Sequence, residues 1–353
     1  MRFKKRYFWR GLLIMISLAI VGTTAYVAHS YIWSLQVQNF ASKVNHRNSY
    51  AIYDGTTIEQ VLDMIEKDYD IGSHMYFRLH ARLMNFHYPE PGYYTFDSII
   101  SDREIIRRLK IGEQTPVKIT WNNAIRTREQ LAAKVTGNLR IDSATLLSYL
   151  ENDTFLIQYG MNKENSRCLF IPNTYEVFWT ITPEQLFARM YNEYNTFWNA
   201  ERRAKAEKLG LTPIQVAIIA SIIEGESRNK NELPLIASLY LNRVRKGMLL
   251  QACPTVKYAV GDFKLRRILY RHLQTDSPYN TYKTPGLPPG PISCPNPQSI
   301  DYVLNAPETD YLFMCANPAL DGTHIFSSSY RNHANAAAQY HHMMDTLNTS
   351  QNN

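Results

Sequence analysis

An apolar helix that ends in two carboxyl groups is predicted by the stretch Ile214-Gln-Val-Ala-Ile-Ile-Ala-Ser-Ile-Ile-Glu224-Gly-Glu226-Ser. Thr212 is a typical N-cap residue, and Pro213 suits the first helical position. Before Glu224, only one glutamine and one serine interrupt the apolar side chains, so we expect the helix to be buried on nearly all sides. A helix of this kind belongs at the centre of a core, and it brings Glu224 to the edge of that core.

Glu224 lies at the C-terminal end of this predicted helix. Burial and the negative end of the helix dipole both raise the pKa of a carboxyl group. A carboxyl that stays protonated near neutral pH can act as a general acid. The alternative is a structural role, in which Glu224 marks the point where the helix reaches solvent.

Glu226 is the residue most easily confused with Glu224. Two positions apart on a helix point in directions roughly 200° apart, so both side chains face one substrate only if the helix ends between them. Gly225 would allow such a break. We therefore assign catalysis to Glu224 and a supporting or substrate-binding role to Glu226.

Positive charge is concentrated at the start of the chain. The 353 residues suffice for two or three domains and carry a net charge of +7. The remaining 33 basic residues nearly balance the 31 acidic ones, so the composition does not indicate a nucleic-acid partner. Five basic residues lie in the first ten positions: Arg2, Lys4, Lys5, Arg6 and Arg10.

An uncharged segment of 23 residues, Gly11–Trp33, follows the basic cluster. About 20 apolar residues span a bilayer, so a single transmembrane anchor is predicted at 11–33. The positive-inside rule places residues 1–10 in the cytoplasm and the bulk of the protein outside, on the inner (cytoplasmic) membrane. A cleaved signal peptide is the alternative, with residues 23–25 as the cleavage site. The apolar stretch continues past that site, which favours the retained anchor.

Four cysteines are present, and the expected extracytoplasmic compartment permits disulfides. Their spacing fixes no pairing, so disulfides and free thiols both remain open. No His-Glu-x-x-His motif occurs, which argues against a metallopeptidase. We predict no metal and no cofactor.

The sequence predicts an α+β fold. A polar linker at 34–49 leads to a small unit at 50–115 and then to a larger mixed helical and strand region at 116–350. The small unit orders its elements as strand, helix, helix, strand, which resembles the LysM-like units of cell-wall proteins, although many small α+β domains share that order. Its predicted elements are strands at 51–53 and 91–96 and helices beginning at 57, 76 and 102.

The larger region is predicted to be mainly helical, with one long irregular loop. Residues 278–297 hold seven prolines and two glycines, a composition that excludes a helix or a central strand. The other predicted elements are a strand at 117–120 and helices at 127–135, 143–150, from 183 onward and at 234–246.

Four later segments could carry chemistry in addition to the first helix. Each has a structural interpretation when taken alone: the proline loop is a rigid connection, and a single histidine is often a satisfied core residue. Together, polar residues with proline and aromatic neighbours could line a sugar cleft. The segments are Leu250–Val256, Ser277–Ile292, Asp321–Phe326 and His333.

The order of these motifs resembles the endolytic murein transglycosylase family. The resemblance covers essentially the whole chain, including the anchor, and is strongest from 168 to 333. It is carried by Ala220-Ser-Ile-Ile-Glu224-x-Glu226, Asn242-Arg243, Leu250-Gln251, Pro254-Thr255-Val256, Tyr279-Asn280-Thr281-Tyr282, Gly286-Leu-Pro-Pro-Gly290-Pro-Ile292, Gly322-x-His324-x-Phe326 and, upstream, Pro172-Asn-Thr174-Tyr175.

The resemblance implies a lytic transglycosylase that cuts nascent peptidoglycan strands between N-acetylmuramic acid and N-acetylglucosamine. The muramyl C6 hydroxyl then closes on C1 and leaves a 1,6-anhydro end. Glu224 maps to the family's catalytic acid/base, and peptidoglycan synthases (penicillin-binding proteins) are the implied partners. Residues that we expect to bind the glycan or to hold the loop of Glu224 are Glu226, Gln251, Asn280, Tyr282 and His324.

The chain departs from the family pattern at two places. Cys253 stands where the family usually has Asp, and Arg167-Cys168 stand where it usually has Glu-Gly. These changes put substrate contacts near the cleft in doubt and leave Glu224 untouched. Two rival functions remain: a non-catalytic peptidoglycan-binding scaffold for wall synthases, and a true hydrolase that leaves reducing ends.

Overall fold

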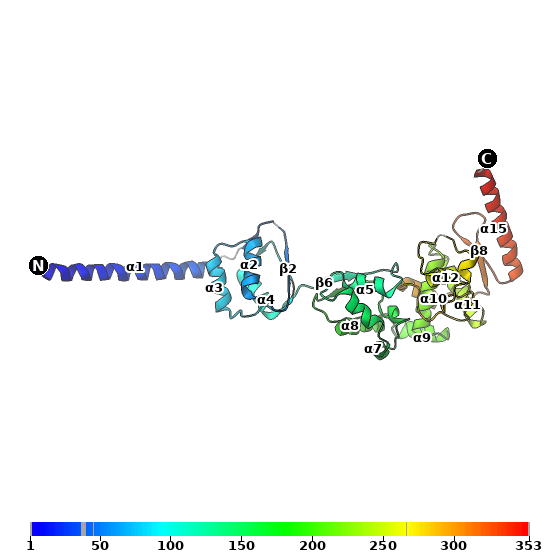
Figure 1. Ribbon diagram of the computed structural model, residues 1–353, viewed down its shortest axis with the longest axis horizontal. Helices are drawn as coiled ribbons and strands as arrows, with labels where there is room; N and C mark the ends of the chain where they lie inside the picture. The colour runs from blue at the N-terminus through cyan, green and yellow to red at the C-terminus, as the bar shows by residue number, and fades with distance from the viewer. Residues whose placement is uncertain (1, 37–39, 45, 266, 352–353) are drawn as a thin grey trace. The chain divides into compact units, whose positions relative to one another are not determined.

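The computed structural model describes residues 2–36, 40–44, 46–265 and 267–351. The chain divides into two compact units, residues 1–117 with 177–180 and residues 118–176 with 181–353. Both units combine helices with short strands, so the fold is α+β, as predicted (Figure 1).

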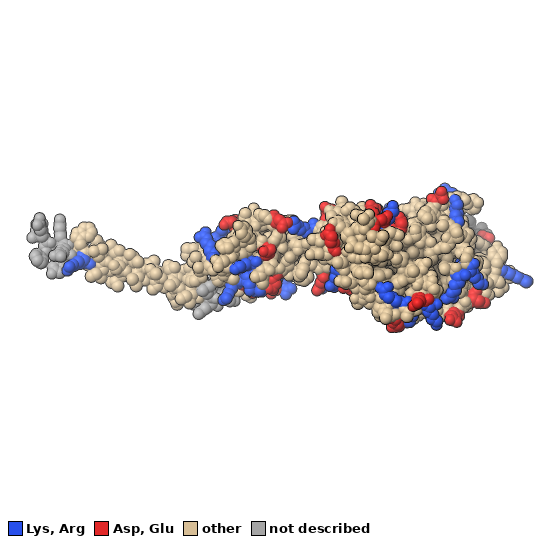
Figure 2. Space-filling view, turned by 90° about the horizontal axis from the view of Figure 1, so that it is seen from below, with Lys and Arg blue, Asp and Glu red and all other residues tan. Residues whose placement is uncertain are grey.

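Helix α1 (Arg2–Gln36) contains the predicted anchor. Its segment Phe8–Ile32 has a mean hydropathy of 2.0 and is long and apolar enough to cross a membrane. The apolar side chains along this segment are exposed, and Figure 2 shows an uncharged surface along most of the helix. An exposed apolar helix of this length is consistent with membrane anchoring.

The first unit packs helices against two small antiparallel sheets. Strand β2 (Asn48–Ile52) pairs with β4 (Gly92–Phe96), and the pairing places Tyr50 opposite Tyr94. Strand β1 lies between β3 and β5 in the other sheet. The remaining elements are β1 (Phe40–Ser42), β3 (Tyr69–Asp70), β5 (Ile99–Ile100), α2 (Ile58–Asp68), α3 (His74–Leu83) and α4 (Asp102–Ile111).

Residues 40–42, which the sequence places in the linker, instead form β1. Phe40 is buried and packs edge-on against Phe77, with ring centroids 4.9 Å apart. Three residues are too few to show a strand pattern, and both partner strands of β1 are distant in sequence. The packed unit therefore begins earlier than residue 50.

The second unit is organised around α10 (Pro213–Glu226), which packs against α11 (Leu233–Arg245), α12 (Cys253–Val260) and α14 (Pro297–Leu304). Strand β8 (Phe313–Ala316) pairs antiparallel with β9 (His324–Ser327). The remaining elements are β6 (Val117–Thr120), α5 (Arg128–Thr136), α6 (Ser143–Leu150), α7 (Asp153–Leu156), the 3-10 turns η1 (Ile157–Tyr159) and η2 (Ser166–Leu169), β7 (Thr174–Val177), α8 (Pro183–Phe197), α9 (Ala200–Lys208), α13 (Tyr270–Leu273) and α15 (Tyr330–Gln351).

The proline-rich residues 278–296 hold no helix or strand, as predicted, whereas Pro297, the last residue of the predicted loop, begins α14. Contacts with other segments fix this loop against the rest of the unit. The Ile292 N–H donates to the Ser221 hydroxyl on α10 at 3.0 Å. A Cβ at Gly290 would lie only 1.9 Å from the Glu164 carbonyl oxygen, so the loop can approach this closely only because position 290 is glycine.

Candidate active site

Helix α10 brings Glu224 to the edge of the core. Thr212 caps the helix in a reciprocal capping box with Gln215, and Pro213 occupies the first turn, as predicted. All side chains from 216 to 223 are buried. The helix does not break at Gly225 but continues to Glu226, so the break that this glycine would allow is not formed.

Glu224 and Glu226 nevertheless border one pocket of about 440 Å³, which we call the Glu224 pocket. Gly225 is exposed to this pocket, and its two neighbours flank it, each rotated by roughly 100° around the helix. A Cβ at Gly225 would lie 2.5 Å from Cβ of Pro254. Position 225 therefore serves the close packing of α10 on α12 rather than a helix break.

The two carboxyl oxygens of Glu224 have different surroundings. Oε1 accepts a hydrogen bond from the Asn296 N–H at 2.7 Å. Oε2 is buried and has no hydrogen-bond partner within the described part of the chain. Burial raises the pKa of Glu224, and the nearby polar groups of Ser299, the Asn296 backbone and Asn123 oppose part of that rise. The predicted upward shift is confirmed in direction.

Glu226 is held by a different partner. The Tyr240 hydroxyl donates to its Oε1 at 2.5 Å. Burial raises the pKa of Glu226 to about 7, against the Tyr240 hydrogen bond and the nearby His324 and Arg243, which lower it. Glu226 can therefore change its protonation state near neutral pH.

A second pocket of about 250 Å³ adjoins Glu226. It brings together four of the predicted site residues from distant parts of the sequence: Glu226, Gln251, Tyr282 and His324. Gln251 is exposed, and its backbone has a positive φ of 52°, a conformation that few non-glycine residues adopt. Glu226 and Cys253 border both pockets.

Asn280 occupies a different position from the other predicted residues. Its side chain is buried, and its amide donates to the carbonyl oxygens of Leu273 at 2.9 Å and Thr275 at 2.7 Å. Its Oδ1 accepts from the Tyr282 N–H at 3.1 Å. These bonds hold the loop that carries Tyr282, which differs from the two roles expected for Asn280, so glycan binding and support of the Glu224 loop stay predictions.

Glu232 is a site residue that the sequence did not suggest. It precedes α11 and is only 7% exposed. Its Oε1 accepts from the His324 backbone N–H at 2.6 Å, and its Oε2 lies 3.0 Å from His324 Nδ1 and 3.4 Å from the Ser227 hydroxyl. A carboxylate at Nδ1 favours the tautomer that leaves Nε2 free to bind another group. Ninety-two positions separate Glu232 from His324, so no local pattern marks the pair.

Of the two departures from the family pattern, Cys253 borders both pockets, whereas Arg167 and Cys168 are buried. Cys253 is a free cysteine whose Sγ lies 3.4 Å from the Tyr282 hydroxyl, and partial desolvation of the thiol group raises its pKa. Arg167 is buried and donates to the carbonyl oxygens of Arg126 and Pro291 and to the Tyr258 hydroxyl. It therefore fastens the proline loop to α12. The other three cysteines are also free thiols.

This arrangement is suited to proton transfer. Burial raises the pKa of the Glu224 carboxyl, which favours its protonated form, and Oε1 accepts a hydrogen bond from a backbone N–H. Glu226, Gln251, Tyr282 and His324 supply polar groups that can hold a sugar next to that carboxyl.

Known proteins resemble this chain over most of its length. The sequence pattern of the YceG-like family matches residues 50–339. An endolytic murein transglycosylase of Bacillus subtilis (strain 168) is 28% identical over 305 residues, which cover 82% of this chain and 83% of that protein. An endolytic murein transglycosylase of Streptococcus pneumoniae (strain D39) is 23% identical over 356 residues, 92% of this chain but only 64% of that protein.

A solved structure shares the fold. The crystal structure of a yceG-like protein from Listeria monocytogenes superposes with a TM-score of 0.53 at 26% sequence identity, covering 82% of this chain and 98% of that one. The resemblance predicted from the motifs is thereby confirmed at the level of the family. On the family match to residues 50–339, the chain belongs to the YceG-like family.

Proposed function

We propose that this protein is a membrane-anchored lytic transglycosylase that cuts murein glycan strands internally, between N-acetylmuramic acid and N-acetylglucosamine. The two relatives described above are named endolytic murein transglycosylases, and the chain belongs to their family. The observation that carries the proposal is the Glu224 carboxyl, which is buried beside a pocket with one oxygen fixed and the other unpaired within the described residues.

In the proposed reaction, Glu224 acts first as an acid and then as a base. The proton of its carboxyl passes to the glycosidic oxygen as the bond from that oxygen to muramyl C1 breaks, and the N-acetylglucosamine leaves with a hydroxyl group. The muramyl C6 oxygen bonds to C1, and its proton returns to Glu224. No water is consumed, and the product carries a 1,6-anhydro end. Because the nucleophile is intramolecular, a second catalytic carboxylate is not required.

The adjoining pocket is proposed to position the glycan. Tyr282, Gln251 and the free Nε2 of His324 offer hydrogen-bonding groups for hydroxyl and acetamido substituents. Glu226 contributes as a binding residue, since its Oε1 is already held by Tyr240. Asn280 contributes indirectly, through the loop of Tyr282.

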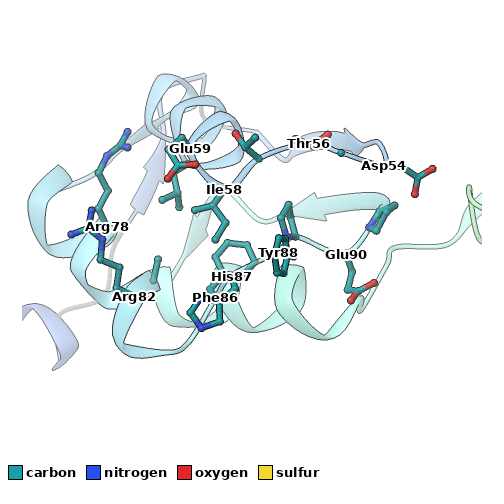
Figure 3. Close-up of a pocket in the computed structure, with 16 residues that line it drawn as sticks. Asp54, Thr56, Ile58, Glu59, Arg78, Arg82, Phe86, His87, Tyr88 and Glu90 are labelled. Atoms are coloured by element: carbon teal, nitrogen blue, oxygen red, sulfur yellow. The ribbon is translucent and has the colours of Figure 1, made fainter.

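The first unit, excluding α1, is proposed to be a LysM-like glycan-binding module. A pocket of about 770 Å³ lies between the turn after β2 and the segment after α3. Figure 3 shows Asp54, Thr56 and Ile58 on one side and Phe86, His87 and Tyr88 on the other. Aromatic rings beside polar groups suit the apolar faces and hydroxyls of a sugar. The proposed domains are an anchor at 11–33, this module and the catalytic region at 116–350.

The proposed location follows from α1 and the basic residues before it. The N-terminus would lie in the cytoplasm, and both units would face the murein. There the enzyme would terminate strand elongation beside the peptidoglycan synthases that produce its substrate.

The experiment that tests the reaction uses the full chain in detergent micelles and uncrosslinked murein strands in water enriched in oxygen-18. A lytic transglycosylase yields anhydro-ended fragments without the heavy isotope. Reducing ends labelled with oxygen-18 would instead identify a hydrolase.

A further inference from the structure

Three cationic side chains border the Glu224 pocket: Arg126, Arg228 and Lys257. None of them forms an ion pair with a carboxylate among the residues that the structure describes. Arg126 lies over the Phe263 ring at 5.2 Å, and the Lys257 ammonium donates to the Leu265 carbonyl oxygen at 2.7 Å. Arg228 is exposed. Elsewhere in the same unit, arginines such as Arg202 are paired with carboxylates, here Asp301 at 2.8 Å.

The carboxyl groups of the pocket leave this positive charge uncompensated. Glu224 is bonded to the Asn296 N–H and Glu226 to the Tyr240 hydroxyl, so neither is paired with these cations. The segment that follows α12 adds further positive charge, because residues 264–271 contain four basic residues and no acidic one. Leu265 and Ile268 of that stretch line the pocket itself.

We propose that Arg126, Arg228 and Lys257 bind a carboxylate of the peptide attached to the muramyl residue that is cleaved. This inference rests on the proposed function, because it takes the substrate to be a murein strand. The alternating glycan is itself uncharged, so the cations have no partner on the sugars. The peptide is attached through the lactyl group of the muramyl ring and carries free carboxylates. An internal cut at muramyl C1 brings that peptide next to the acid Glu224.

The same anionic chemistry has one other source, the pyrophosphate at the lipid-linked end of a nascent strand. A pyrophosphate occurs once per strand, whereas a peptide accompanies every muramyl residue. A cationic pocket that also contains the acid must accept a group present at each internal cleavage position. The peptide carboxylate fits that requirement.

The test compares four substrates with the full chain in detergent micelles. They are peptide-bearing strands, strands stripped of peptide by an amidase, strands whose peptide carboxylates are amidated, and peptide-bearing strands without the terminal pyrophosphate. We expect kcat/KM to fall about tenfold on loss of either the peptide or its charge, and to be unchanged without pyrophosphate. The preference should shrink as salt screens the charges.

Amino-acid substitutions test whether the cations of the Glu224 pocket cause the preference for peptide-bearing strands. Arg228→Glu should lower kcat/KM on peptide-bearing strands about tenfold and leave stripped strands unaffected, since an exposed ion pair contributes only a few-fold and reversal adds repulsion. The matched control is Lys208→Glu, at the exposed end of α9, which makes the same charge change away from this pocket. The combined Arg126→Gln, Arg228→Gln and Lys257→Gln variant should cleave all four substrates at similar rates.

Equal cleavage of peptide-bearing and stripped strands by the wild type would overturn the inference. So would a preference that follows the pyrophosphate, or a charge reversal at Arg228 that slows both substrates equally. Failure of the proposed function gives a different result: the wild type would cleave none of the four substrates.

Discussion

The two carboxyl groups at the end of α10 differ in what holds their oxygen atoms. Glu224 has a backbone N–H at Oε1 and no partner at Oε2 within the described chain, whereas Glu226 accepts from Tyr240. Burial raises the pKa of both. The sequence could predict the burial of Glu224, because the apolar run before it is unbroken. The tyrosine that holds Glu226 is 14 residues away and could be found only in three dimensions.

The raised pKa of Glu226 makes stability depend on pH. Its folded pKa of about 7 exceeds the ordinary value of 4.5, so the folded state keeps a proton that the unfolded state releases. The contribution to stability is fully present below about pH 4.5 and is lost as pH rises through 7. Glu226→Gln should therefore unfold at the same temperature as the wild type at pH 4.5 and be more stable at pH 8, by at most about 3 kcal/mol.

Thermal unfolding of both proteins at the two pH values checks this prediction. The Gln variant retains an acceptor for the Tyr240 hydroxyl, so a loss of that hydrogen bond does not obscure the result. A variant less stable than the wild type at pH 8 would contradict the assignment of the titrating group.

Activity should also depend on pH in a predictable direction. Glu224 must be protonated to act as the acid, and its pKa is raised by burial. The value of kcat should therefore stay constant on the acid side of neutral pH and decrease as pH rises through that raised pKa. A pH profile of kcat on murein strands measures this. A rate that keeps increasing with pH would mean that the group acts only as a carboxylate.

Glu232 and His324 should act as one positioning pair. Glu232 holds both the backbone and the ring of His324, so Glu232→Ala should free the ring and His324→Ala should remove it. Each change should lower kcat/KM on the order of 10- to 100-fold through loss of substrate positioning. The double variant should be little worse than either single one, since both remove the same interaction. If the losses in kcat/KM were additive in this double-mutant cycle, the two residues would act independently.

At the scale of elements, the contact of α10 with α12 depends on Gly225. Gly225→Ala would place a methyl group 2.5 Å from the rigid ring of Pro254, so we expect a loss of about 1–3 kcal/mol in unfolding free energy. Gly137→Ala is the matched control, because a Cβ there meets nothing closer than 3.6 Å. Denaturant unfolding of both variants checks the prediction, and equal stability of the two would refute it.

Most helices could be predicted because their ends carry local signals. Thr57 and Thr212 cap their helices as expected, and Thr127 and Thr182 also act as N-caps, each through its hydroxyl oxygen. Helix α12 was not among the predicted helices, although Pro254 lies in its first turn and Gly261 ends it in a left-handed conformation. Strands of two or three residues, such as β1, depend on partners that are distant in sequence and show no period of their own.

At the scale of the whole molecule, α1 is the feature consistent with membrane anchoring. The exposed apolar segment Phe8–Ile32 should remain part of the mature protein. Intact-mass measurement of the chain purified from the membrane fraction should therefore include residues 1–36. A mass that lacks about the first 25 residues would instead identify a cleaved signal peptide.

The candidate site combines segments that only the folded chain brings together. Glu226, Gln251, Tyr282 and His324 come from one helix, two loops and a strand, yet they line one pocket. Their order along the sequence could identify the family, but it could not show that Asn280 is buried or that Glu232 holds His324. Both facts depend on side-chain packing between distant segments.

The most direct test of the central claim is mass spectrometry of the products from uncrosslinked, peptide-bearing murein strands. The wild type, Glu224→Gln and Glu226→Gln should be compared as full chains in detergent micelles, with binding of the strands measured in parallel. We expect internal fragments with 1,6-anhydromuramyl ends from the wild type and from Glu226→Gln, and none from Glu224→Gln, which should still bind. Cleavage by Glu224→Gln but not by Glu226→Gln would reverse the assignment, and binding without cleavage by the wild type would identify a scaffold.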